Sequence, residues 1–124
     1  MSTAGRKKLE PGPDHEITVE PADTEVVVRR GDQVVARSRR ALLLREDGYP
    51  PVAYVPLEDV DPALLKASDT TTWCPYKGEA TYRSLRFDDA LLEDAVWTYE
   101  APHEAVAAIA DHVAFYPQAL TIEA

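Results

Sequence analysis

The chain has 124 residues and a formal net charge of −9 at pH 7, with 22 acidic and 13 basic side chains. This length suits one domain with a modest core, and the negative charge would repel nucleic acids and anionic membranes, so we expect neither as a partner. The single cysteine excludes an internal disulfide and zinc sites built from paired cysteines. No apolar run approaches the roughly 18 residues of a membrane span or forms a signal-peptide core, so we expect a cytoplasmic protein.

The first 22 residues are polar, contain three prolines and show no hydrophobic period. We therefore predict a flexible N-terminal tail over 1–22, followed by a single domain over 23–124. The basic cluster Arg6-Lys7-Lys8 could bind an anion, although three charges near a terminus are more often simply solvated.

Short aliphatic runs separated by polar turns predict β-strands at the start of the domain. Residues 25–29 and 33–37 flank the turn signal Arg30-Gly31-Asp32, a pattern typical of a β-hairpin. Residues 41–45 follow as a third antiparallel strand.

Arginines occupy three of the four positions just before that third strand, at Arg37, Arg39 and Arg40. Their planar guanidinium groups could bind a carboxylate or a phosphate. The alternative is that they protect a strand edge from aggregation. Arg40 is the candidate for ligand binding, because it adjoins the apolar strand.

The remainder of the domain is expected to be further strands with a few helical pieces. One or two short helical turns are expected within 57–66, with Asp61 capping the second and Pro62 at its first position. The Ala-rich segment 102–113 predicts one C-terminal helix. The predicted fold class is mainly β (α+β), a small antiparallel domain with that single helix. Further strands are expected at 52–56, 80–87, 91–100 and 119–122.

The segment 74–78, Cys-Pro-Tyr-Lys-Gly, gathers residue types that are rare elsewhere in the chain, including its only cysteine. Pro75 fixes its own φ and favours an extended conformation before it, and Gly78 can take a positive φ. We therefore predict a rigid turn between two strands, which would hold a thiol, a phenol and an amine close together.

Cys74 and Lys77 are the candidate reactive groups of this turn. A nucleophilic cysteine needs a nearby cation, which Lys77 could supply, but a lone cysteine beside aromatic residues is more often a small buried hydrophobe. Lys77 could bind an anion, form a Schiff base or be solvated. His103 and His112 lie far along the chain, although either could fold back onto the turn.

Aromatic residues could form the walls of a pocket beside the turn, because they combine a large contact area with one polar atom each. The alternative is that they belong to the core. The five candidates are Tyr54, Trp73, Tyr76, Trp97 and Tyr99.

The sequence shows no pattern for a metal or cofactor, so we expect none. Its histidines and its cysteine lack metal-ligand spacing. The acidic pairs at 88–89 and 93–94 look like a turn and a strand start rather than a magnesium site. Neither a glycine-rich phosphate loop nor a Gly-x-Ser-x-Gly elbow occurs.

Several short motifs between residues 25 and 123 carry a resemblance to a known family. They are Ser38 with Arg40, Tyr54-Val55-Pro56, Asp69-Thr70, Cys74-Pro75-Tyr76-Lys77-Gly78 with Ala80 and Tyr82, Ala95-Val96-Trp97-Thr98-Tyr99 with Pro102, and Val113-Ala114-Phe115-Tyr116. Together they resemble the bacterial family called domain of unknown function 427 (DUF427), of which the Cys-Pro-Tyr-Lys-Gly segment is the most specific mark. The resemblance implies a small β-tent fold, similar to those of methionine sulfoxide reductase B, Yippee and the ligand-binding domain of cereblon. A nucleotidyltransferase name has been attached to the family, but this chain has neither the Gly-Ser nor the spaced Asp pattern of that chemistry.

We therefore expect a binding module that holds a small anionic or amide-bearing ligand through Lys77 and Arg40. One alternative is an enzyme of the transferase type, in which Cys74 or Lys77 attacks a carbonyl or phosphoryl group. Another is a protein-interaction domain without a ligand, and the oligomeric state stays open. The candidate ligand-binding residues are Arg40, Tyr54, Trp73, Cys74, Tyr76, Lys77, Trp97 and Tyr99.

Overall fold

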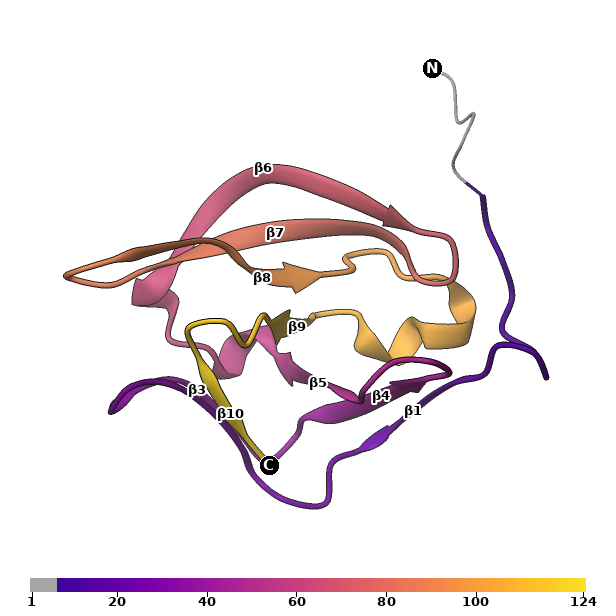
Figure 1. Cartoon of the computed structure of the whole chain (residues 1–124), viewed down its shortest axis with the longest axis horizontal. Coiled ribbons are helices and arrows are strands. Elements are labelled where there is room, and N and C mark those ends of the chain that lie inside the picture. Colours follow the sequence, from indigo (N-terminus) through magenta and orange to yellow (C-terminus); the bar gives the residue numbers. More distant parts are fainter. Residues whose placement is uncertain (1–6) are drawn as a thin grey trace.

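The computed structural model describes residues 7–124 and shows a mainly β protein built from antiparallel strands, as predicted. The larger sheet has seven strands in the order β1-β4-β5-β9-β8-β7-β6, and the smaller has three in the order β10-β2-β3 (Figure 1). The larger sheet consists of β1 (Ile17–Pro21), β4 (Leu42–Glu46), β5 (Val52–Pro56), β9 (His112–Phe115), β8 (Leu91–Thr98), β7 (Gly78–Arg86) and β6 (Leu65–Cys74). The smaller sheet consists of β10 (Thr121–Glu123), β2 (Val26–Arg30) and β3 (Gln33–Ser38).

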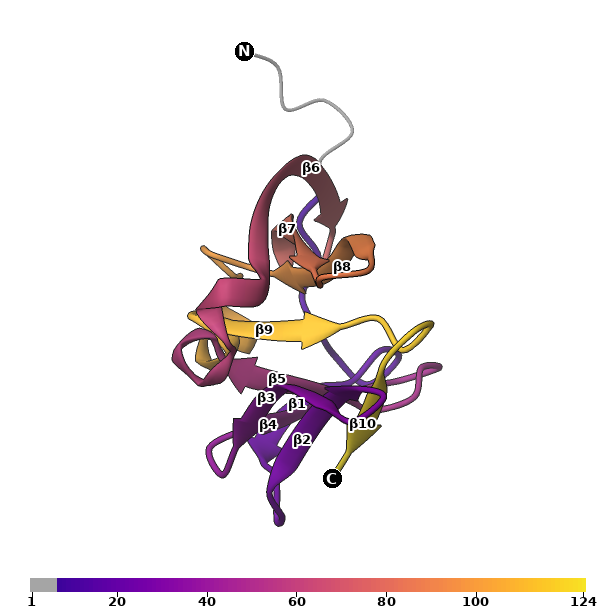
Figure 2. The ribbon, with the colours of Figure 1, turned by 90° about the vertical axis from the view of Figure 1, so that its left-hand side faces the viewer.

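Strand β9 joins two halves of the larger sheet. It pairs with β5 through Val113 opposite Val55, and with β8 through Phe115 opposite Val96. Two views at right angles show β6, β7 and β8 on one side of β9, with β5, β4 and β1 on the other (Figure 1 and Figure 2). The backbone between residues 112 and 115 must therefore be extended, because both of its edges are hydrogen-bonded to neighbouring strands.

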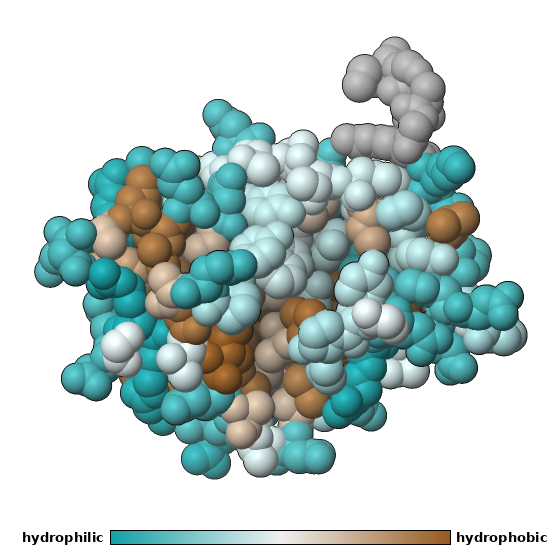
Figure 3. Space-filling view, viewed as in Figure 1, coloured by the Kyte–Doolittle hydropathy of each residue, from teal (hydrophilic) through white to brown (hydrophobic). Residues whose placement is uncertain are grey.

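Apolar side chains form two buried clusters. The larger includes Val26 and Val35 from the smaller sheet and Leu85 and Val96 from the larger one, so it ties the sheets together. The second cluster contains Tyr54, whose side chain is almost fully buried. In the space-filling view, hydrophobic residues show in the middle of the molecule between hydrophilic ones, so part of the apolar surface remains accessible (Figure 3).

The predicted helix over 102–113 is wrong. A short 3₁₀ helix, η3 (Glu104–Ile109), forms instead, and non-helical angles at Val106 interrupt it. Asp111 then takes a φ of +63°, after which the chain enters β9. The apolar spacing correctly indicated which side chains are buried, because Val106 and Ile109 both lie in the core. It did not distinguish an α-helix from a 3₁₀ turn, because a spacing of three residues fits both. None of the helices within the described residues is long and apolar enough to cross a membrane.

The first strand, β1, lies within the segment 1–22 that was predicted to be a flexible tail. Strand β1 pairs with β4 from Ile17 opposite Glu46 to Pro21 opposite Leu42. Its alternation of Ile17 and Val19 toward the second cluster with polar residues between them is a strand signal that the proline-rich context concealed. The first part of the predicted tail, including Arg6 of the basic cluster, lies outside the described residues.

The local turn and capping predictions are confirmed. The hairpin of β2 and β3 turns at Gly31, which has a φ of +57°. Two 3₁₀ turns, η1 (Leu57–Asp59) and η2 (Pro62–Leu64), follow β5. The Asp61 side chain accepts a hydrogen bond of 3.0 Å from the backbone N–H of Ala63, and Pro62 occupies the first position of η2.

Candidate functional site

The Cys-Pro-Tyr-Lys-Gly segment is a tight turn between two strands, as predicted. Strand β6 ends at Cys74 and β7 begins at Gly78, and these two residues are paired in the sheet. The backbone N–H of Lys77 donates to the carbonyl of Cys74 at 3.2 Å. Gly78 has a φ of +112°, a value that side-chain-bearing residues rarely adopt. The turn therefore fixes the direction in which the Lys77 side chain leaves the sheet.

The Lys77 side chain is buried in an ion pair. Its Nζ lies 2.8 Å from Oε1 of Glu46, and the two side chains are only 10% and 11% exposed. The same Nζ lies 3.5 Å from the Sγ of Cys74. The turn thus brings its amine and its thiol together, with a carboxylate from the end of β4 as a third group.

Glu46 also connects the turn to the N-terminal segment. Its Oε2 lies 2.7 Å from Nε2 of His15, whose ring stacks on Tyr76 with centroids 4.1 Å apart. Burial raises the pKa of Glu46, but the hydrogen bonds from Lys77 and His15 outweigh it and leave the pKa below its usual range. The carboxylate is therefore ionised at neutral pH and holds both partners.

The residues before β1 cross the turn as a strap, here defined as residues 7–16. The backbone N–H of Leu9 donates to the carbonyl of Pro75 at 2.9 Å, and the indole N–H of Trp73 donates to the carbonyl of Lys7 at 2.8 Å. With the contacts of His15, these bonds hold the strap at both ends. Sequence reasoning missed this, because the strap has no hydrophobic period of its own.

We expect His15→Phe to lower the free energy of unfolding by about 1.5 kcal/mol, because the ring can still stack on Tyr76 but the hydrogen bond to the Glu46 carboxylate is lost. His15→Ala should cost about 1 kcal/mol more, through loss of the stacking. Urea unfolding at neutral pH measures both values. Equal stability of the wild type and the Phe variant would contradict a strap held by this bond.

A pocket of about 420 Å³ opens beside the Lys77–Glu46 pair, which is within the usual range for small-molecule sites. Its walls come from β4, β5, β8 and the turn, so it lies where the two halves of the larger sheet approach one another. It is lined by Leu44, Glu46, Tyr49, Pro50, Val52, Tyr54, Cys74, Lys77, Tyr82, Trp97, Tyr99 and Tyr116.

The aromatic walls of the pocket are fixed by contacts with one another. Trp97 donates its indole N–H to the hydroxyl oxygen of Tyr54 at 3.2 Å, and its ring centroid lies 4.5 Å from that of Tyr116. Burial raises the pKa of Tyr54 and Tyr99 far above the ordinary value, and it raises that of Tyr116 to about 12. All three phenols are therefore protonated at neutral pH and can donate hydrogen bonds.

The structure brings together five of the eight candidate binding residues and places three elsewhere. Tyr54, Cys74, Lys77, Trp97 and Tyr99 all line the pocket. The other three, Arg40, Trp73 and Tyr76, do not belong to its lining.

The rings of Trp73 and Tyr76 serve the outer side of the turn. Trp73 meets His103 edge-on with centroids 5.5 Å apart, while Tyr76 carries the stacked ring of His15. His103 does fold back onto the turn, since its backbone N–H donates to the carbonyl of Lys77 at 2.9 Å. The imidazole of His103 therefore contacts the turn through Trp73. The thiol of Cys74 instead has Lys77 as its hydrogen-bond partner.

Arg40 lies in an ion-pair group away from the turn. Its Nη2 is 2.6 Å from Oε1 of Glu58 and 3.2 Å from Oδ1 of Asp59. The buried Ser38 donates to Asp59 at 2.6 Å and accepts from the backbone N–H of Arg40 at 3.0 Å. These bonds join the end of β3 to η1, so the paired motif Ser38 and Arg40 has a structural explanation.

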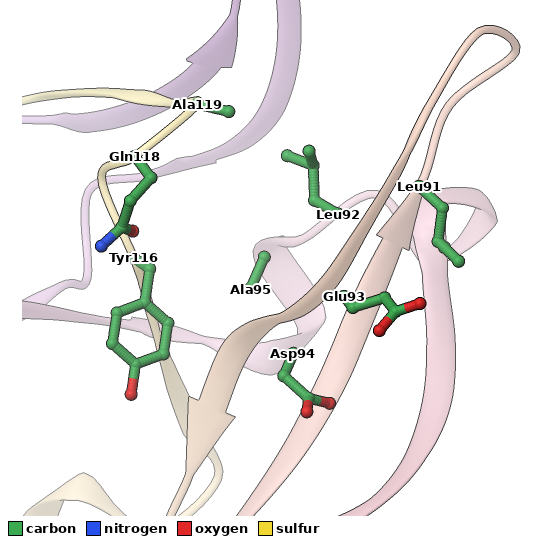
Figure 4. Close-up of a pocket in the computed structure, with 8 residues that line it drawn as sticks. All are labelled: Leu91, Leu92, Glu93, Asp94, Ala95, Tyr116, Gln118 and Ala119. Carbon is green, nitrogen blue, oxygen red and sulfur yellow. The ribbon is translucent and has the colours of Figure 1, made fainter.

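A second hollow, of about 470 Å³, lies between β8 and the segment after β9 (Figure 4). Tyr116 lines it from one side and Leu92 from the other. Of its two acidic residues, Glu93 and Asp94, the second is already engaged, because Ser68 and Thr70 donate to the Asp94 carboxylate and keep its pKa below the usual range. The pocket at Lys77 is therefore the stronger candidate.

Residues 7–124 contain no group of three or more His, Cys, Asp or Glu side chains placed to hold a metal ion. The polar groups of the pocket are thus a lysine, a glutamate, a thiol, an indole and several phenols. This set can hydrogen-bond an organic molecule and stack against a flat ring.

Glu46 and Tyr116 are the pocket residues of most chemical interest that sequence reasoning overlooked as site candidates. Glu46 ends an apolar strand, and Tyr116 follows one. Their positions at strand ends near the turn were the available signal, but only the order of the strands shows that they meet.

Comparison with known protein families supports the resemblance to DUF427 that the short sequence motifs indicated. A family model described as a domain of unknown function (DUF427) matches residues 18–124. No curated protein matches the sequence. The match contains Glu46, Lys77 and the aromatic walls, whereas the strap precedes it. Because the match covers most of the chain, the protein belongs to the DUF427 family.

Proposed function

We propose that this domain binds a small organic molecule in the pocket at the Cys-Pro-Tyr-Lys-Gly turn. The observation that carries the proposal is an accessible hollow of about 420 Å³ whose aromatic walls enclose a buried Lys77–Glu46 pair. Burying a charged pair seldom adds net stability, so its presence at a hollow favours a role for the hollow. The two-sheet antiparallel architecture also supports the β-tent-like assignment that the resemblance implies.

The sequence led us to expect an anionic or amide-bearing ligand, and of these the charge of the pocket disfavours the anion and favours an uncharged or zwitterionic molecule. Lys77 and Glu46 are the charged residues that line it, and each neutralises the other at 2.8 Å. Arg40, the second cation expected to hold an anion, pairs with Glu58 and Asp59 elsewhere. A phosphate would therefore lose its water without gaining an unpaired cation.

A thermal-shift screen of uncharged and zwitterionic metabolites tests the proposal, because a ligand that binds only the folded state raises the melting temperature. Bound hits should also slow alkylation of Cys74 by iodoacetamide. Val52→Trp, which fills the pocket, should abolish both effects, and the exposed Thr71→Trp should preserve them. A broad library without a hit, or hits that survive Val52→Trp, would count against this function.

Thiol chemistry is the second candidate function, and it rests on the distance of 3.5 Å between Cys74 Sγ and Lys77 Nζ. A neighbouring cation stabilises the nucleophilic thiolate. The pairing of Lys77 with Glu46 weakens this effect, and the His103 imidazole packs on Trp73 rather than serving as a base. Rapid alkylation of the free protein well below about pH 8.5 would favour this alternative.

A further inference from the structure

The hydroxyl of Tyr99 has an unusual environment in the pocket. The residue is 7% exposed, and among residues 7–124 the structure gives its hydroxyl no hydrogen-bond partner. Tyr99 lines the same pocket as Tyr54, Cys74, Tyr82 and Glu46. Tyr99 therefore lines the pocket with a hydroxyl that makes no hydrogen bond to residues 7–124.

An unused hydroxyl at such a buried position favours a role in binding. A phenylalanine at position 99 would make the same apolar contacts, so packing alone does not require the hydroxyl. The ring packs in the second cluster with Val106 and Ile109, so its direction is fixed by the core. A ligand in the pocket would reach this group without any rearrangement of the fold.

The hydroxyls of Tyr99 and Tyr54 offer the pocket two free hydrogen-bond donors. Both oxygens of Glu46 already accept bonds, from Lys77 and His15. The oxygen of Tyr54 accepts from Trp97, so the Tyr54 O–H proton is still available to donate. Both phenols are protonated at neutral pH, as tyrosines ordinarily are, and burial raises their pKa further.

From this arrangement we infer the chemical class of the ligand, an inference that rests on the function proposed above. The pocket takes a flat, uncharged molecule that presents a carbonyl-type oxygen to the hydroxyl of Tyr99. The rings of Trp97 and Tyr116 supply apolar faces for the body of the molecule. An ionised carboxylate is disfavoured, because the single lining cation is committed to Glu46.

Three probes of nearly the same size test separately the need for a carbonyl oxygen and the effect of a negative charge: acetophenone, α-methylstyrene and benzoate. Acetophenone carries the carbonyl oxygen, α-methylstyrene replaces it with a methylene group, and benzoate replaces it with a charged carboxylate. Binding is measured by fluorescence of Trp97 in a Trp73→Phe background, since Trp97 lines the pocket and Trp73 does not. We expect acetophenone to bind about three- to tenfold more tightly than α-methylstyrene, and benzoate to bind more weakly than acetophenone.

The same titrations in Tyr99→Phe should reduce the preference for acetophenone over α-methylstyrene by about three- to tenfold. The variant should melt at about the same temperature as the parent, because this hydroxyl makes no hydrogen bond to residues 7–124. Tyr49→Phe is the matched control: it alters a tyrosine that lines the same pocket but is 65% exposed, and it should leave the preference unchanged.

The outcomes distinguish this inference from the function on which it rests. If acetophenone and α-methylstyrene bind equally, if benzoate binds best, or if Tyr99→Phe leaves the ratio unchanged, the ligand class is wrong while pocket binding stands. If no probe binds, or if Val52→Trp leaves all binding intact, the pocket function falls together with the inference.

Discussion

Replacing Lys77 with Met is expected to lower the free energy of unfolding by about 3 kcal/mol, because it leaves a buried carboxylate without its main partner. The substitution keeps a long apolar stem but removes the ammonium that lies 2.8 Å from Glu46. Glu46 is 11% exposed, so its carboxylate would stay buried with His15 as its remaining partner. Urea unfolding at neutral pH gives the loss directly.

A double-mutant cycle tests whether the stability loss of Lys77→Met comes from its ion pair with Glu46. Glu46→Gln removes the charge that Lys77→Met leaves unpaired, so the double variant should be clearly more stable than the sum of the two single losses predicts. The exposed Lys66→Met serves as the matched control and should change stability by less than about 0.5 kcal/mol. Strictly additive losses in the cycle would show that the two groups are not coupled.

The effect of Lys77→Met should depend on pH with a definite sign. The pKa of Glu46 is lower in the folded chain than in the unfolded one, so its ionisation stabilises the fold. This contribution is fully present above the unfolded pKa of about 4.3 and is lost as the pH falls through the folded pKa. The stability difference between wild type and variant should therefore shrink below about pH 4, whereas a difference unchanged in strong acid would contradict the assignment to Glu46.

The parts of the site that could be predicted from the sequence are those that local chemistry determines. Pro75 and Gly78 restrict the backbone by themselves, which is why the turn between two strands was predicted correctly. Trp97 and Tyr99 lie two residues apart at the end of a strand, and both line the pocket as that spacing indicates.

The same rule of alternation explains two candidates that lie outside the pocket. Neighbouring residues of a strand point to opposite faces, so Trp73 and Cys74 could not both enter one pocket, and the thiol is the one that does. The turn separates Tyr76 from Lys77 in a similar way, with the phenol stacked on His15 and the amine directed inward. This part of the arrangement follows from strand alternation alone.

Other features depend on the tertiary fold and could not be read from the chain. Glu46 lies 31 residues from both His15 and Lys77 in sequence, and only the pairing of β1 with β4 and the return of the β6–β7 turn bring the three together. The extended conformation of 112–115 likewise comes from its two neighbouring strands, which override the helical preference of an Ala-rich segment.

Gly78→Ala is expected to cost about 2 kcal/mol, because the backbone at this position is unfavourable for any residue with a Cβ. Its φ is +112°, and an added methyl group would lie 3.3 Å from Cδ2 of His103 and 3.4 Å from the carbonyl oxygen of Ala101. Relief of these contacts must move the turn or the start of η3. Either movement would loosen the ion pair of Lys77, so alkylation of Cys74 should become faster as stability falls.

Gly31→Ala separates the steric effect from the backbone effect. Gly31 also has a positive φ, of +57°, but apart from its two chain neighbours no residue has an atom within 4 Å of the position that its Cβ would take. Its replacement should cost about 1 kcal/mol and should leave the alkylation rate of Cys74 unchanged. Urea unfolding of both variants measures the difference, and equal losses would mean that crowding by His103 and Ala101 contributes nothing. A larger loss at Gly78, accompanied by faster alkylation, would show that this glycine holds the turn in the shape that buries Lys77 against Glu46.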